Sequence, residues 1–156
     1  MAFGSCGIEG RGKVAEEHIR RVTDAEHNVT VFTVVGAVDA AEVSGHIMAF
    51  LTGDPTPLVL WDIRAGSVTG LSLVDVLWII KRGKPFADRR RGGRTAIVCV
   101  QTLDYAVSRM FQSLAEAMEI PFEIAVFRDH EEARRWLNES RGGEGSDGSP
   151  RPRARS

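Results

Sequence analysis

One short stretch constrains this chain more than any other, because it joins a buried strand, a polar turn and a capped helix. Residues 58–61 form a continuous apolar run, which is typical of a strand buried on both faces of a sheet. Asp62 ends the run, and a turn rich in glycine, serine and threonine leads to Ser72, where a second apolar run begins. In an open α/β sheet, ligands and partners usually meet the fold at the loop that leaves a central strand. We therefore expect the functional surface of the chain at this turn.

Apolar periodicity and turn residues predict the other elements. The β-branched run at 29–35 indicates a strand, and the mixed run at 17–22 indicates an edge strand that pairs with it as an antiparallel hairpin. Capping residues followed by apolar residues at helical spacing predict helices, and buried apolar runs predict further strands. These elements are expected at residues 39–52, 72–82, 94–100, 103–120, 122–127 and 129–137.

The helix expected after the central strand is unusually apolar. Ser72 and Asp75 have the spacing of a capping box, in which each side chain accepts a hydrogen bond from the other residue's backbone N–H. Seven of the eight residues from 73 to 80 are hydrophobic, so apolar side chains lie almost all round this helix. We expect the helix to be heavily buried.

The order of the elements, β-β-α-β-α-β-α-β-α, predicts a single α/β domain with a mixed sheet and packed helices. A length of 156 residues suits one domain. The glycine-rich residues 1–13 are interpreted as a flexible leader and residues 14–138 as the domain. Residues 139–156 are interpreted as a disordered tail, because Ala154 is their only hydrophobic residue.

The charge balance and the apolar runs exclude several classes of protein. The net charge of −1 predicts no global attraction to nucleic acid or to an anionic membrane, although it leaves room for a local patch. No apolar run approaches the ~20 residues needed to span a membrane, and the N-terminus has no signal-peptide pattern. The two cysteines, Cys6 and Cys99, form no disulfide framework. We therefore expect a cytoplasmic protein.

The residue types that usually bind metals or act as nucleophiles are scattered along the chain. His18, His27, His46 and His130 occur without CxxC, HxH or HExxH spacing, so neither a metal site nor a cofactor is expected. Cys99 lies inside a strand pattern, where a thiol is usually an inert core residue.

A basic run at residues 81–94 is the strongest charge feature. Asp88 is its only acidic residue and Phe86 its only aromatic residue, so a base-stacking surface is not indicated. Two interpretations are open: a solvated connection, or a patch that receives phosphates, RNA or an acidic protein surface. The cations are Lys81, Arg82, Lys84, Arg89, Arg90, Arg91 and Arg94.

Two carboxylates follow predicted strands. Asp62 follows the central strand and Asp104 follows the strand at 94–100, so the two could share a cleft as an acid/base pair. The alternative is local: Asp62 bonds the turn after it, and Asp104 caps its helix.

The turn itself offers hydroxyl groups near a helix N-terminus. The backbone N–H groups and the helix dipole at such a position favour an anion, including a phosphate on a side chain. The alternative is that Ser72 serves only as an N-cap. The predicted binding residues are Asp62, Arg64, Ser67, Thr69 and Ser72.

Three segments, taken with the order of the elements, resemble the STAS-like, SpoIIAA-like family (STAS/SEC14 type) of small bacterial proteins. They are LVLWDIRAGSVTGLS at 58–72, RTAIVCV at 94–100 and VFRDHEEARRWL at 126–137. The similarity runs from about Glu17 to Leu137. The resemblance implies a single STAS-like domain over nearly the whole predicted ordered part.

The resemblance also implies a function. STAS domains of anti-sigma-factor antagonists are interaction modules without catalytic activity, switched by phosphorylation of a serine in an Asp-Ser-Ser-Gly turn. When the family pattern is aligned with this sequence from Asp62 without gaps, its Asp-Ser-Ser-Gly turn falls on residues 70–73. Only Ser72 matches the pattern there, at the position of the second serine. Ser72 is therefore the candidate phospho-acceptor.

The expected function is that of a non-catalytic regulatory module that binds a protein partner through the turn. Other relatives are thought to hold apolar or lipid-like ligands, so a small apolar-ligand or lipid-binding protein is the alternative. An enzyme that uses Asp62 and Asp104 is the third hypothesis.

Overall fold

The computed structural model describes residues 17–142, with side chains as far as Glu139. One five-stranded sheet runs in the order β2-β3-β4-β5-β6, with β2 antiparallel to β3 and all other neighbours parallel. The strands are β2 (Ile19–Asp24), β3 (Val29–Ala37), β4 (Leu58–Ser67), β5 (Arg94–Val98) and β6 (Glu123–Phe127). The helices are α1 (Ala40–Thr52), α2 (Leu73–Gly83), the 3-10 helix η1 (Lys84–Arg90), α3 (Thr102–Ala117) and α4 (His130–Gly142). The predicted fold class and order of elements are confirmed.

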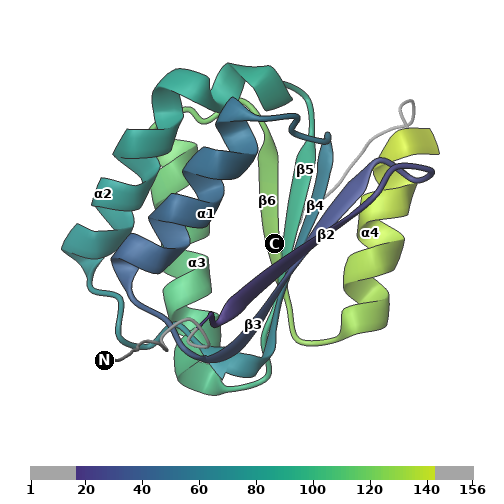
Figure 1. Ribbon diagram of the computed structural model, residues 1–156. Helices are drawn as coiled ribbons and strands as arrows, with labels where there is room; N and C mark the ends of the chain where they lie inside the picture. The colour runs from purple at the N-terminus through teal and green to yellow at the C-terminus, as the bar shows by residue number, and fades with distance from the viewer. Residues whose placement is uncertain (1–16, 143–156) are drawn as a thin grey trace, which may run out of the picture.

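Helices cover the two faces of the sheet unequally. Figure 1 shows α1, α2 and α3 together on one side of the sheet and α4 alone on the other. The larger core lies under the three helices, where Phe32 stacks on Trp61 at 4.3 Å between ring centroids and meets Phe50 edge-on. The smaller core lies under α4 and includes Leu60 and Leu137.

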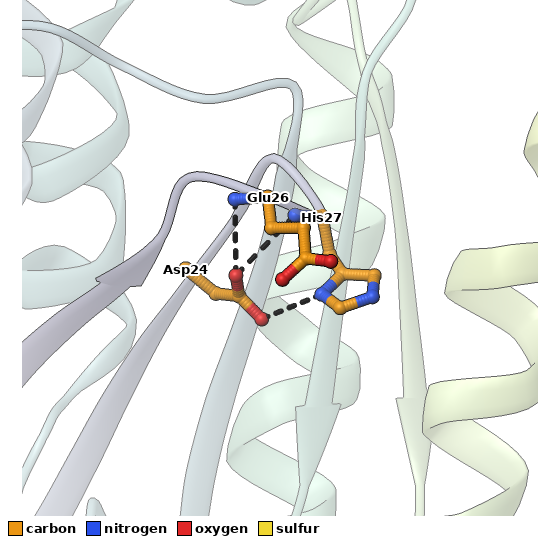
Figure 2. A group of neighbouring side chains, drawn as sticks. All are labelled: Asp24, Glu26 and His27. Carbon is orange, nitrogen blue, oxygen red and sulfur yellow. Dashed lines mark hydrogen bonds and ion pairs between the residues drawn. The ribbon is translucent and has the colours of Figure 1, made fainter.

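The β2–β3 hairpin forms as predicted and is closed by its own turn residues. The Asp24 Oδ1 atom accepts from the backbone N–H groups of Glu26 and His27, at 3.1 and 3.3 Å. Its Oδ2 atom lies 2.7 Å from Nδ1 of His27 (Figure 2). This bond lowers the pKa of Asp24 and raises the pKa of His27.

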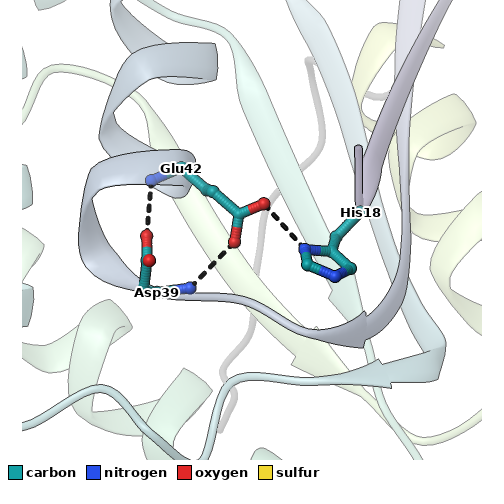
Figure 3. Close-up of polar contacts among 3 residues, drawn as sticks. All are labelled: His18, Asp39 and Glu42. Atoms are coloured by element: carbon teal, nitrogen blue, oxygen red, sulfur yellow. Dashed lines mark hydrogen bonds and ion pairs between the residues drawn. The ribbon is translucent and has the colours of Figure 1, made fainter. Parts of the chain in front are cut away.

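The predicted capping box of α1 is present and also holds the start of β2. The Asp39 side chain accepts from the Glu42 backbone N–H at 2.9 Å, and Glu42 Oε1 accepts from the Asp39 N–H at 3.2 Å. The second oxygen of Glu42 lies 2.7 Å from Nδ1 of His18 (Figure 3). One carboxylate therefore joins the helix start to the edge strand.

The central strand is longer than predicted, so the expectation that Asp62 ends it is wrong. β4 continues to Ser67, because its residues 65–67 pair with residues 35–37 of β3 after a bulge. The strands approach closely there: a Cβ at Gly66 would lie 2.5 Å from Cγ1 of Val34. Glycine is what permits this pairing.

The expectation that α2 is heavily buried is also wrong. Its Ser72–Asp75 capping box is confirmed. Its buried residues, however, form one stripe of Val76, Ile79, Ile80 and Gly83. The side chains of Leu73, Val74 and Trp78 are 51, 73 and 42% exposed.

The basic run is neither a uniform patch nor only a solvated connection, because one of its arginines is a core residue. Arg90 is 5% exposed. Its guanidinium donates four hydrogen bonds, to the carbonyl oxygens of Thr56, Pro57 and Arg94 and to Oγ1 of Thr95. Burial lowers the pKa of Arg90 to about 9, which still leaves the cation charged at neutral pH. Arg90 therefore holds η1 against the sheet.

Arg94 is likewise not part of an exposed basic patch. It lies in β5, pairs with Glu123 at 2.9 Å and stacks over the Trp136 ring at 4.5 Å. The cations of the run that stay exposed are Lys81, Arg82, Lys84, Arg89 and Arg91.

The last helix extends past the predicted start of the tail. α4 runs to Gly142 and so includes residues 139–142, which were expected to be disordered. The predicted leader at 1–13, with Cys6, and the remainder of the predicted tail lie outside the described residues. Within the described part of the chain, no helix is both long and apolar enough to cross a membrane.

Candidate functional site

The loop between β4 and α2 is fixed by a buried carboxylate from a distant helix. Asp104, in the first turn of α3, is 1% exposed. Its Oδ1 atom accepts from the backbone N–H of Val68 at 2.9 Å and from the Ser67 hydroxyl at 3.1 Å. Hydrogen bonds to a charged acceptor are among the stronger ones in proteins. Asp104 therefore clamps the loop at its first residues.

The hydroxyl groups of the loop continue this network towards solvent. The single hydroxyl proton of Ser67 goes to Asp104, so the 2.9 Å contact between Ser67 Oγ and Thr69 Oγ1 has Thr69 as donor. The Thr69 backbone N–H also donates to Ser67 Oγ, at 3.2 Å. Thr69 is exposed and Ser67 is half-buried. The structure therefore brings these two predicted residues together.

Ser72 closes the loop at its other end. Its Oγ accepts from the Asp75 N–H at 3.1 Å, and its own N–H donates to Asp75 Oδ2 at 2.9 Å. The N-cap interpretation of Ser72 is confirmed. Its role as a phospho-acceptor stays a prediction.

Exposed apolar side chains surround the loop. Val100 and Leu103, in the next loop along the same edge of the sheet and at the start of α3, are 46 and 67% exposed. Figure 1 shows α2 and α3 beginning at this same end of the sheet, and Leu73 and Val74 stand exposed on the first turn of α2. The edge thus combines a rigid polar loop with accessible apolar groups.

Asp62 and Arg64 lie apart from this loop network. Trp61 and Ile63 belong to the core under α1, α2 and α3, so the alternation along β4 directs Asp62 to the α4 side. There the Arg64 guanidinium donates to both Asp62 oxygens at 2.8–2.9 Å and, with a smaller contribution from His130, lowers the pKa of Asp62.

The proposed cleft shared by Asp62 and Asp104 is therefore wrong. Asp62 lies on the α4 face with Arg64 as its partner, whereas Asp104 lies on α3, on the opposite face, and bonds the loop. Asp104 does not cap its helix either, because the N-cap residue is Gln101 and makes no side-chain cap bond.

The inner side of the loop borders an apolar cavity of about 60 Å³. Val68 and Leu71 of the loop line it, with Val76 and Ile79 of α2 and with Val107 and Phe111 of α3. Pockets for drug-sized ligands measure roughly 300–1,000 Å³. The cavity is therefore large enough for a few heavy atoms, and much too small for a lipid chain.

Two other groups with reactive side chains have structural explanations. Cys99 is fully buried beside Ser108, and burial raises the pKa of its thiol, as expected of an inert core residue. Among the described residues, one group of potential metal ligands, Asp24, Glu26 and His27, lies within 4.8 Å. The Asp24 and His27 side chains are already joined by the hydrogen bond that helps to close the hairpin, so we assign the group no metal.

Comparison with known proteins finds similarity in three-dimensional structure. No protein-family model and no curated protein matches the sequence. One similar solved structure is an uncharacterised DUF3478-family protein with a SpoIIAA-like fold from Shewanella loihica PV-4, at 24% identity and a TM-score of 0.49. That match covers 76% of this chain and 91% of the other.

A second similar structure is an anti-sigma factor antagonist from Mycobacterium paratuberculosis. It is 16% identical, with a TM-score of 0.47, and the match covers 79% of this chain and 97% of the other. The first structure is described as having a SpoIIAA-like fold, which is the fold that the sequence resemblance named.

Proposed function

We propose that this chain is a non-catalytic regulatory module that acts in the cytoplasm by binding a protein partner through the β4–α2 loop. The observation that carries the proposal is the rigid construction of that loop. Asp104 holds its start and the Ser72–Asp75 capping box holds its end, while Thr69 and neighbouring apolar groups stay exposed. A preorganised loop loses little conformational entropy when a partner binds.

The chemistry at this edge supports a binding role over a catalytic one. Its one buried carboxylate, Asp104, is already engaged by two hydrogen-bond donors of the loop. The exposed side chains Leu73, Val74, Val100 and Leu103 supply the apolar area that protein interfaces bury.

A charged substitution among these exposed apolar side chains tests the proposal. Leu103→Glu should weaken capture of the partner at least about tenfold, because a glutamate would have to be desolvated in the interface. Val22→Glu is the matched control, since Val22 is also a large exposed apolar residue, at 57%, but lies on the edge strand β2. Equal affinity of the two variants for a partner purified with the wild-type chain would refute the proposed surface.

A second candidate function, binding of a small apolar ligand, is favoured by the cavity behind the loop. Its volume of about 60 Å³ restricts the ligand to a few heavy atoms unless the helices move apart. Native mass spectrometry of freshly purified protein should then show a small adduct that Ile79→Phe, a substitution that fills the cavity, removes. Protein that is consistently free of adducts would count against this function.

A further inference from the structure

The outer surface of α2 carries apolar and cationic side chains that the fold does not use. Val74, Trp78 and Lys81 follow one another at i, i+4 and i+7, opposite the buried stripe of the helix, so they form one exposed row. Lys84 follows at the end of the helix, and Phe86, in η1, is 37% exposed. We call these residues, together with Arg82, the α2 outer surface.

The positive charge of this surface is not neutralised by the protein. Within the described chain, neither Lys81, Arg82 nor Lys84 forms an ion pair. The two carboxylates closest in sequence are engaged elsewhere: Asp75 accepts the N–H of Ser72 in the capping box, and Asp88 pairs with Arg91. The surface is therefore a local cationic patch on a chain whose net charge is −1.

We propose that the α2 outer surface docks on an anionic lipid bilayer. Cations beside exposed aromatic and aliphatic side chains are the combination found on helices that lie in the membrane interface. The lysines would meet lipid phosphates while Val74, Trp78 and Phe86 enter the headgroup region. This contact is peripheral and shares only Val74 with the proposed partner-binding surface.

The observations favour a bilayer over a nucleic acid. Single-stranded RNA is bound by aromatic rings that are open to stacking. One face of the Trp78 ring is covered by the Arg82 guanidinium, 5.1 Å from the ring centroid, and Arg82 is held in place by a 2.9 Å bond to Ser44. Val74, which is 73% exposed, is aliphatic and offers a base nothing to stack on.

Vesicle flotation of the full chain tests the proposal. Vesicles of phosphatidylcholine with about 30% phosphatidylserine should bind the wild-type chain, and vesicles of phosphatidylcholine alone should bind it far less; added salt should weaken the binding. Lys81→Gln combined with Lys84→Gln should lower the partition coefficient by about 25-fold, about fivefold for each charge near the surface. Trp78→Ala should lower it by about tenfold.

A matched double variant removes two positive charges elsewhere. Arg20→Gln with Arg135→Gln changes exposed residues of β2 and α4 and should bind almost as the wild type does. The arginines at 151, 153 and 155 are present in every variant, so their contribution cancels.

Three results would overturn the proposal: no binding to the anionic vesicles at low salt, equal loss in the two double variants, or binding of a single-stranded RNA probe at this surface without binding of vesicles. Lys81 and Lys84 are exposed, so the double lysine variant should fold, and its thermal unfolding verifies this. If Trp78→Ala does not fold, the lysine variant alone decides the test.

Discussion

Replacing Asp104 by alanine should lower the free energy of unfolding by about 2–4 kcal/mol. The substitution leaves the Val68 N–H without an acceptor, and Val68 is only 7% exposed, so water cannot easily replace the carboxylate. A buried donor without a partner costs about 1–3 kcal/mol. The small space left by the carboxyl group accounts for the remainder.

A double-mutant cycle separates this clamp from a general packing defect. Ser67→Ala alone should cost about 0.5–1.5 kcal/mol, since it removes the half-buried hydroxyl that donates to Asp104 and accepts from the exposed Thr69. In the Asp104→Ala background the same change should cost about 1 kcal/mol less, because the bond is already absent. Urea denaturation followed by circular dichroism gives all four free energies. Additive losses, or a cost of Asp104→Ala below about 1 kcal/mol, would refute the clamp.

Three further changes test other parts of the structure. Gly45→Ala should raise the free energy of unfolding by about 0.5–1 kcal/mol, because a Cβ at this helical position meets nothing within 4 Å. Gly66→Ala should lower the free energy of unfolding sharply, because its Cβ would lie 2.5 Å from the neighbouring strand. Urea denaturation of the two variants should show these opposite signs. Arg90→Met should cost about 3 kcal/mol because four buried or half-buried acceptors lose their donor; a loss below about 1 kcal/mol in the same assay would mean that this guanidinium does not hold η1. His27→Gln should remove a pH-dependent stabilisation: Asp24 raises the folded pKa of His27 above 6.5, so the pair stabilises fully below that pH and less as pH rises through the raised value. Denaturation at about pH 5.5 and about pH 8.5 should show a larger difference between wild type and variant at the lower pH, and equal differences would contradict the assignment.

Local signals in the sequence predicted most of the fold. The capping boxes at Asp39 and Ser72, the apolar run at 58–61 and the β-branched run at 29–35 each specify an element through residues close in sequence. The order of the elements and the antiparallel hairpin followed from them.

Contacts between distant residues decided what the sequence could not predict. Asp104 bonds Val68 across 36 positions, and no pattern of spacing marks such a pair. Arg90 is buried because carbonyl oxygens from two other segments happen to converge on it, so a charge run alone did not reveal it. The exposure of Trp78, by contrast, was missed although the sequence carries a signal for it. The charged residues Asp75, Lys81 and Arg82 lie on the same side of α2 as Trp78, opposite the buried stripe.

The most direct test of the proposed function is hydrogen exchange, followed by mass spectrometry, on the chain with and without its captured partner. Exchange in the partner-bound state should be slower at residues 67–74 and 100–104, which contain the loop, the start of α2 and the start of α3. The β2–β3 hairpin at residues 19–37 should be unchanged. Protection confined to that hairpin, with residues 67–74 unaffected, would contradict binding through the β4–α2 loop.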